Sequence, residues 1–139
     1  MKYNPYENVY VHDAILPQST TATALTQVYF DAAGYSECLV IAHFGTAASS
    51  AEANLVVEES DSTTEASFAA ITGASFRQVT TSNDNLLYVG RLDLSKRKRY
   101  IRPMNVADGS NAAIISCCIV GLGKQTRPTT QANTVAFNL

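Results

Sequence analysis

The sequence predicts an all-β protein, folded as a single antiparallel β-sandwich of about eight strands. Short runs rich in Val, Ile, Leu, Phe and Tyr recur along the chain, and Gly, Asn, Asp and Ser divide them at a spacing typical of sandwiches and barrels. No window keeps apolar residues at helical spacing over several turns. A chain of 139 residues can bury one hydrophobic core, so we expect one domain to carry the whole function.

The expected strands are runs of high β propensity that end at turn residues such as Gly34 and Gly45. Each run has the usual length of a strand in globular proteins. In chain order the expected strands cover residues 25–32, 38–44, 53–60, 74–80, 86–94, 99–107, 112–121 and 134–139, with 9–15 as a further candidate.

Hydrophobic patterning indicates where these strands lie in the sandwich. Residues 38–44 and 112–120 are apolar almost without interruption, which is typical of central strands packed on both faces. Pro103 cannot donate a ladder hydrogen bond, which predicts that strand 99–107 lies at an edge or contains a bulge. Residues 86–94 alternate, which predicts one face with Leu86, Tyr88, Gly90, Leu92 and Leu94 and an opposite face with Leu87, Val89, Arg91 and Asp93.

Basic residues are concentrated in one stretch. The formal net charge is -2, yet six of the ten basic residues fall between Arg91 and Arg102. Such a cluster could bind nucleic acid, act as a targeting signal or form a charged rim at the end of a sheet. A strand would divide these charges between two faces, and only Tyr100 is near enough to stack on a base, so nucleic acid is not an expected partner. We expect residues 96–99 to form a rim at one end of the sandwich, either solvated or in contact with another protein.

The titratable residues form no recognisable catalytic motif. We expect His43 in the core or on a sheet face, and His12 on the surface. Glu58 and Glu59 should point to opposite faces of a strand, which favours a solvated strand end over paired carboxylates or a calcium site. Residues 121–124 (GLGK) lack the spacing of a phosphate loop, and their glycines should let the chain leave the sheet. We therefore expect no enzyme, no metal ion and no cofactor.

The three cysteines are Cys38, Cys117 and Cys118, an odd number without metal-ligand spacing. We expect all three to be small buried hydrophobic residues, with no disulfide framework. Cys117 and Cys118 are adjacent and should point to opposite faces of a strand, so they could not hold one metal ion together. This pattern favours synthesis in a reducing cytoplasm.

The chain divides into a sandwich and two flanking segments. We expect an N-terminal arm with a first short strand at 1–24, the β-sandwich at 25–123, and a C-terminal arm with a short terminal strand at 124–139. No stretch has the apolar length of a signal core or a membrane span, so no membrane is expected as a partner.

Four features follow one another between residues 33 and 139. A Gly-Tyr pair enters an apolar strand in GYSECLVIAHFG, and a later strand ends in Glu-Ser-Asp within ANLVVEESDSTTEASFAAI. A strand of the type RYIR follows in YVGRLDLSKRKRYIRPMNV, and the polar C-terminal segment GLGKQTRPTTQANTVAFNL ends in a short apolar run. In this order the features resemble the small capsid decoration, or cement, proteins of tailed bacteriophages.

This resemblance implies a jelly-roll-like sandwich on the outer capsid surface of the virion. Such a protein stabilises an icosahedral shell by bridging subunits of the major capsid protein, and it has no catalytic residues. The implied partners are the major capsid protein and other copies of this chain, as a homodimer or homotrimer. The candidate interface residues are Tyr3, Tyr6, Lys96, Arg97, Lys98, Arg99, Arg102, Arg127 and Phe137.

The composition agrees with a protein that buries surface against partners. Only 16% of the residues are charged, whereas 46% are hydrophobic. An alternative function is that of a carbohydrate-binding or receptor-binding β-sandwich in a phage tail or fibre, because jelly rolls also host lectin-like sites. The absence of Trp argues against a sugar-stacking platform, although the seven Tyr residues keep this alternative open.

Overall fold

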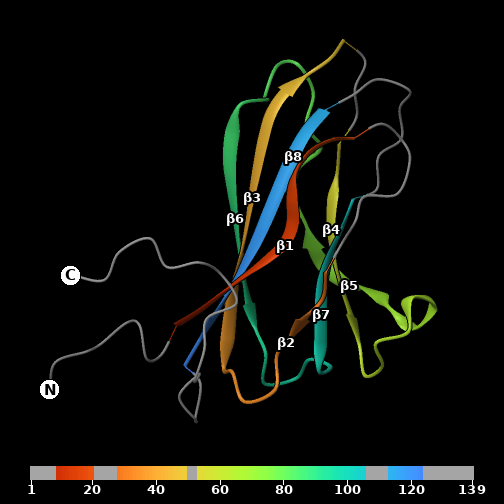
Figure 1. Ribbon diagram of the computed structural model, residues 1–139, viewed down its shortest axis with the longest axis vertical. Helices are drawn as coiled ribbons and strands as arrows, with labels where there is room; N and C mark the ends of the chain where they lie inside the picture. Colours follow the sequence, from red (N-terminus) through yellow and green to blue (C-terminus); the bar gives the residue numbers. More distant parts are fainter. Residues whose placement is uncertain (1–8, 21–27, 50–52, 106–112, 124–139) are drawn as a thin grey trace, which may run out of the picture.

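The structure is a computed structural model that describes residues 9–20, 28–49, 53–105 and 113–123. Regular structure in these residues is β, apart from one short 3-10 helix, η1 (Glu65–Ser67). The strands form two antiparallel sheets of four strands each, packed face to face (Figure 1). The prediction of an all-β sandwich is therefore confirmed.

The strands follow the chain in an order close to the expected one. They are β1 (Val9–Thr20), β2 (Phe30–Asp31), β3 (Glu37–Ala47), β4 (Leu55–Ser60), β5 (Ala69–Ser75), β6 (Leu86–Asp93), β7 (Tyr100–Asn105) and β8 (Ala113–Leu122).

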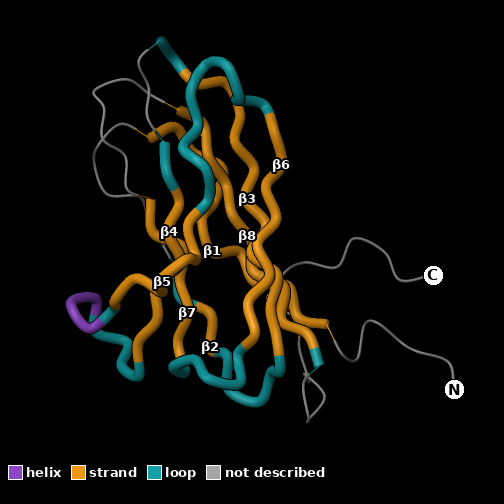
Figure 2. Tube along the Cα trace, turned by 180° about the vertical axis from the view of Figure 1, so that it is seen from behind, coloured by secondary structure: helices purple, strands orange, loops and turns teal. Residues whose placement is uncertain are grey.

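The topology is that of a jelly roll. Sheet A has the order β1-β8-β3-β6, and sheet B has the order β2-β7-β4-β5. Strand β1 pairs with β8, β2 with β7, β3 with β6 and β4 with β5, which is the pairing of one long hairpin rolled into two sheets. Consecutive strands lie in different sheets, except β4 and β5, which are neighbours in sheet B (Figure 2). The predicted jelly-roll sandwich is confirmed.

The core lies between the two sheets and is built from alternate residues of each strand. Along β3 and β8, buried and less buried residues alternate, because successive side chains of a strand point to opposite faces. The predicted central position of both strands in their sheet is confirmed. The largest fully buried side chains include Phe30, Phe44, Ile15, Leu55, Ile101, Ile115 and Ile119.

The N-terminal strand is longer than the sequence predicts. Strand β1 reaches Thr20 and pairs with β8, with register shifts between Asp13 and Ile15 and between Ile15 and Gln18. Pro17 lies in the second shift, where the regular ladder is interrupted and a missing N–H is tolerated. Residues 18–20, expected in the N-terminal arm, therefore belong to the sandwich.

Two strand predictions differ from the structure. Of the strand expected at 25–32, only β2 forms among the described residues. The strand expected at 74–80 begins earlier, as β5, and Val79 forms only an isolated bridge with Ala53. Ala and Gly have low β propensity, so Ala69–Ser75 gives a weak signal, but pairing with β4 and a bulge at Gly73 (φ 82°) hold it in the sheet.

The position of Pro103 also differs from the prediction. Strand β7 lies between β2 and β4, so it is not an edge strand, and its pairing with β4 has no bulge. Pro103 faces Val57 of β4, whereas β2 pairs only with Tyr100 and Ile101. The short β2 leaves one flank of Pro103 without a described neighbour, which accommodates a residue without a backbone N–H.

Several expected features lie outside the described residues. In the expected arms they are residues 1–8, 21–24 and 124–139. In the expected strands they are residues 25–27, 106–107, 112 and 134–139.

Candidate protein interface

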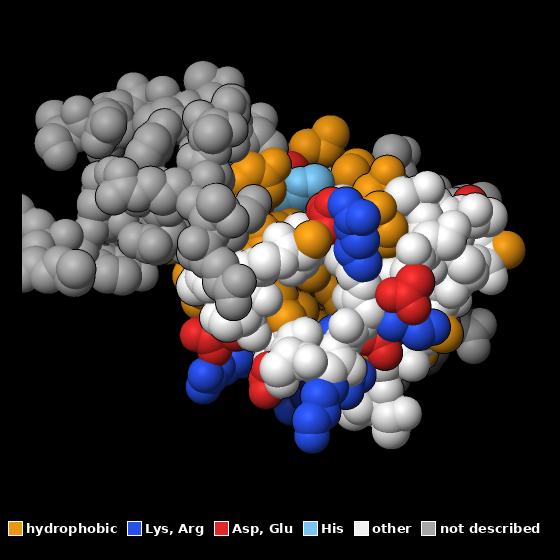
Figure 3. Space-filling model, turned by 90° about the horizontal axis from the view of Figure 1, so that it is seen from below, with side chains coloured by type: hydrophobic (Ala, Val, Ile, Leu, Met, Phe, Trp, Pro, Cys, Tyr) orange, Lys and Arg blue, Asp and Glu red, His pale blue; other side chains and the backbone are white. Residues whose placement is uncertain are grey.

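The basic run forms the turn between β6 and β7. Residues 94–99 connect the end of β6 to Tyr100, at the end of the sandwich where β4 ends and β3 begins (Figure 1). The sequence prediction placed this run at one end of the sandwich, and the structure agrees. Figure 3 views this end and shows Lys and Arg side chains interleaved with Asp and Glu side chains. The turn is therefore surrounded by counter-charges from the same chain.

Glu59, at the end of β4, holds the middle of the turn. Its Oε1 lies 3.5 Å from Nη1 of Arg97, and its Oε2 accepts a 3.0 Å hydrogen bond from the backbone N–H of Lys98. The Glu59 side chain is 17% exposed, so this contact is shielded from water more than a typical surface ion pair. One carboxylate thus fixes both a basic side chain and the backbone of the basic run.

Arg99 is held by two other carboxylates, those of Asp31 and Asp61. Its guanidinium donates to both carboxylate oxygens of Asp31 in β2, with Nε to Oδ1 at 3.1 Å and Nη2 to Oδ2 at 2.8 Å. Its backbone N–H donates to Oδ1 of Asp61, just after β4, at 3.4 Å. The hydrogen bonds and charge of Asp31 raise the pKa of Arg99 above its ordinary value. The run therefore links the ends of β2 and β4.

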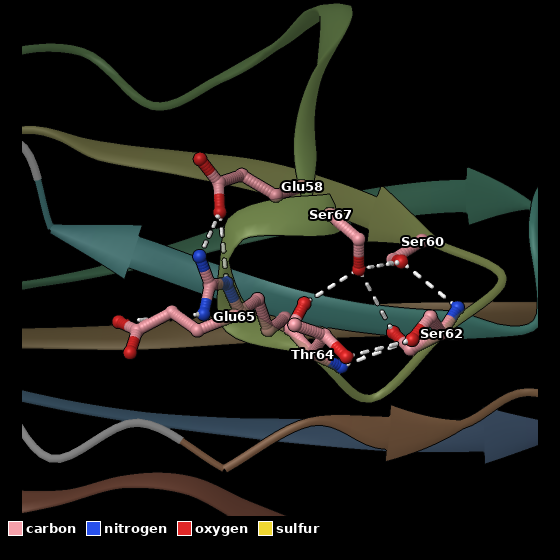
Figure 4. A network of polar contacts seen from close by, with 7 residues as sticks. Glu58, Ser60, Ser62, Thr64, Glu65 and Ser67 are labelled. Atoms are coloured by element: carbon pink, nitrogen blue, oxygen red, sulfur yellow. Dashed lines mark hydrogen bonds and ion pairs between the residues drawn. The ribbon is translucent and has the colours of Figure 1, made fainter.

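Arg102 is a structural residue on the outer face of sheet B. Its Nη2 lies 2.8 Å from Oε2 of Glu58, its Nη1 lies 3.9 Å from Oε1 of Glu65, and its guanidinium covers the Phe68 ring at 4.2 Å. Figure 4 shows the carboxylates of Glu58 and Glu65 beside the hydroxyl network of the β4–β5 connection. The Arg102 side chain is only 11% exposed, so little of it can contact another protein.

That hydroxyl network closes the connection around η1. Ser67 Oγ lies 2.6 Å from Ser60 Oγ and donates to the carbonyl of Thr64, and the N–H of Ser62 donates to Ser60 Oγ at 2.9 Å (Figure 4). These bonds satisfy the hydroxyl of Ser60, which is a fully buried polar residue. The network holds Glu65 where it can reach Arg102.

Lys96 and Lys98 are the basic residues of the run whose charged groups could contact another molecule. No carboxylate of the described residues forms an ion pair with Nζ of Lys96 or Lys98, and both residues are exposed. Arg91, by contrast, forms an ion pair with Glu37 on the neighbouring strand β3, with 2.5 Å between Nη2 of Arg91 and Oε2 of Glu37. The phosphates of a nucleic acid bound here would compete with the carboxylates of the protein itself. The positive electrostatic potential of the rim is therefore too weak to attract nucleic acid strongly.

The outer face of sheet A carries many apolar side chains among a smaller number of polar ones. We use the name sheet A outer face for the surface whose side chains point away from the core on all four strands. Leu87 is 53% exposed and Val89 is 56% exposed, and no described element covers them. The register places the apolar residues in adjacent rows; they are Val11, Leu39, Ile41, Leu87, Val89, Ile114, Cys118 and Val120.

The sequence carries a signal for this face but does not show what covers it. The nearly continuous apolar runs predict that central strands are covered on both faces, yet the described residues cover one face only. The alternation of residues 86–94 placed Leu87 and Val89 on the face opposite Tyr88 and Leu92, which the structure confirms, since Tyr88 and Leu92 pack against the core. Leu87 and Val89 were not among the candidate interface residues predicted from the sequence.

A small hollow interrupts the sheet A outer face beside the β1 register shift. It has a volume of about 190 Å³, and Asp13, His43, Ser116 and Cys118 line part of it. His43 is exposed on the sheet face, one of its two predicted positions. Burial, and next the charge of Asp13, raise the pKa of Cys118, which disfavours a reactive thiolate.

The other histidine is not on the surface, so that prediction is wrong. His12 is half-buried at the side of the core, with its ring centroid 6.4 Å from Tyr10 and 6.1 Å from Phe30. Burial lowers the pKa of His12 below 6.5, against smaller opposing effects of the Val28 backbone and of Asp13. Its Nε2 is buried and has no hydrogen-bond partner among the described residues. The neutral imidazole is the favoured form.

The cysteines are free and differ in burial. Cys38 and Cys117 are buried as predicted, and burial raises the pKa of each to about 12. Cys118 is only half-buried and points away from Cys117, which confirms their opposite faces and corrects the expectation that all three are buried. Reactive thiolates are disfavoured at all three positions.

Gly121 has a role that the sequence analysis missed. It lies inside β8 rather than at the exit of the chain. A Cβ atom there would lie 2.7 Å from Phe30 Cζ and 2.8 Å from Tyr35 Cδ1, so only a glycine allows both rings this close. Gly123, which follows β8, has a φ of 67°.

Within the described residues there is no group of three or more His, Cys, Asp or Glu residues placed to hold a metal ion. The same part of the chain contains no helix long and apolar enough to cross a membrane. The structure brings Lys96, Arg97, Lys98 and Arg99 together at one end of the sandwich and separates Arg102 from them by its burial. Tyr3, Tyr6, Arg127 and Phe137 lie outside the described residues.

Comparison with models of protein families gave no match, and a search of curated proteins gave none.

Proposed function

We propose that this chain is a structural virion protein that decorates the outside of an icosahedral phage capsid and stabilises it by bridging major capsid protein subunits. The observation that carries the proposal is the sheet A outer face. Leu87, Val89 and Ile114 are each about half exposed there. Ile41 and Val120 lie in neighbouring rows of the same face, which also carries the polar residues Arg91, His43 and Ser116. Surfaces of this kind mark protein contacts.

The size of this face supports a weak individual contact. Four strands spaced about 4.8 Å apart and about eight residues long present roughly 500 Å². A stable pairwise interface buries about 800 Å² on each partner. A decoration protein compensates because it binds as a homo-oligomer to a repeating lattice, where several weak contacts act together.

The charge arrangement supports an outer position. The net charge is -2, and the arginines of the rim are paired with carboxylates of the same chain, so there is little positive field to attract packaged DNA. Lys96 and Lys98 remain exposed at the rim and would contact acidic side chains of the shell or of a sister copy. The protein acts through binding alone, without catalytic residues or a cofactor.

The proposal is tested by fractionation of purified virions and by co-sedimentation with empty shells of the major capsid protein from the same genome. We expect the protein in virions in many copies, and in the shell fraction after mixing. Binding to glycans on an array without any association with shells would instead support a receptor-binding protein of the tail or fibre.

A further inference from the structure

Strand β6 is an edge of sheet A with one side unpaired. It pairs with β3, and no strand of the described residues lies on its other side. Leu86 is 49% exposed, and Leu87 and Val89 are more exposed still. A long apolar edge invites uncontrolled pairing with other chains, and native proteins usually cover or charge such edges.

An open groove runs beside this edge on the core side. It lies between β6 and β5, has a volume of about 390 Å³ and reaches the core residues Val40, Val57 and Ile71. The bulge at Gly73 shifts β5 in its pairing with β4, and the groove is lined by residues 72–76. A strand added to β6 would place every second side chain in this groove, as in β-strand addition sites of peptide-binding domains.

The C-terminal segment of this chain starts close to the edge. Leu122, near the end of β8, and Asp93, at the end of β6, both pair with Glu37 of the strand between them. Two strand spacings, about 10 Å, therefore separate the ends of β8 and β6. Residues 124–133, if extended, could span up to ~33 Å, so the residues that follow can reach any part of β6.

The direction and pattern of the segment also fit. A chain that leaves β8 at this end and returns along β6 runs antiparallel to β6, because β6 ends there. In the sequence TVAFNL, the apolar Val135, Phe137 and Leu139 alternate with Thr134, Ala136 and Asn138. This is the period of a strand with one apolar face.

We propose that residues 134–139 pair with β6 of the same chain as a ninth strand and place Val135, Phe137 and Leu139 in the groove. The short connection gives the segment a high effective concentration at its own β6, which favours it over the segment of another copy. Phe137 is then a packing residue of its own sandwich rather than a contact to another protein. This inference does not depend on the proposed function.

Amide hydrogen exchange tests the proposal on the full chain and on a chain that ends at Asn133. In an edge strand, alternate N–H groups lack a partner, so a ninth strand should protect those amides of β6. We expect removal of residues 134–139 to speed their exchange about tenfold or more, while the amides of β8 stay protected and show that the sandwich is folded. Unchanged exchange of β6 would overturn the proposal.

Two matched variants sharpen the test. Phe137→Asp should expose the β6 amides as the deletion does, whereas Asn138→Asp, on the opposite side of the segment, should leave them protected. Protection in the full chain should not change on dilution. Protection that is lost on dilution would show that the strand comes from a second copy, and it would overturn the assignment to the same chain.

Discussion

Arg99 and Asp31 form a two-bond ion pair that joins the basic turn to β2, with donor–acceptor distances of 3.1 and 2.8 Å. One arginine of the basic cluster is thus engaged within its own chain. A double-mutant cycle with Arg99→Gln and Asp31→Asn should give a favourable coupling energy in urea unfolding, and added salt should reduce it. A coupling energy of zero at low salt would contradict this account of the turn.

Removal of the counter-charges should create the nucleic-acid affinity that the native rim lacks. We expect Asp31→Asn combined with Glu59→Gln to bind DNA or heparin weakly, with an affinity that falls as salt increases. Each amide keeps one oxygen that can accept one of the two hydrogen bonds, while its NH2 group, which only donates, replaces the other acceptor. The matched control, Asp13→Asn with Asp84→Asn, changes the net charge equally but away from the rim, and it should not bind. Equal binding by both double variants would show that the affinity depends on the net charge of the protein and not on the position of the charges at the rim.

Acidification should destabilise the protein through His12. Its folded-state pKa is lowered below 6.5 by burial, so the unfolded chain takes up a proton more readily than the folded one. The contribution of His12 to stability is therefore complete above about pH 6.5 and declines as the pH falls from there through the folded-state pKa. Urea unfolding at a series of pH values should show this decline, and His12→Phe should make the curve flatter in that window. An equally steep curve for the variant would exclude His12 as the cause.

Gly121→Ala should be strongly destabilising for its size. The added methyl would meet the rings of Phe30 and Tyr35 in the core, and overpacking of this kind costs about 1–3 kcal/mol. Ser116→Ala, on the sheet A outer face of the same strand, should change the free energy of unfolding by less than about 0.5 kcal/mol. Chemical denaturation of both variants measures the difference. Equal stability of the two would mean that the close approach at Gly121 does not limit the core.

The fold could be predicted from local patterns because most of the strands carry their own signal. The apolar runs of β3 and β8 predicted that these strands are central in their sheet. The alternation of residues in β6 predicted which of its side chains share a face. The Ala69–Ser75 strand could not be found this way, because its Ala and Gly residues have low β propensity and its place depends on pairing with β4.

The candidate site was less predictable because it depends on contacts between distant segments. Counter-charges for the basic run come from Asp31, Glu59 and Asp61, which precede it by many residues and meet it only in the folded topology. Leu87 and Val89 are likewise exposed because no described part of the chain covers the outer face of sheet A. Sequence pattern gives the face of a residue, but not what covers that face.

Binding of two matched variants to capsid shells tests the central claim most directly. Val120→Lys places a charge on the sheet A outer face, whereas Val56→Lys makes the same change at a half-buried position of sheet B. With both variants folded, as thermal melting should show, we expect Val120→Lys to weaken co-sedimentation with shells about tenfold or more, and Val56→Lys to bind like the native protein. Native binding by Val120→Lys would contradict the proposal that this protein decorates a capsid through the outer face of sheet A.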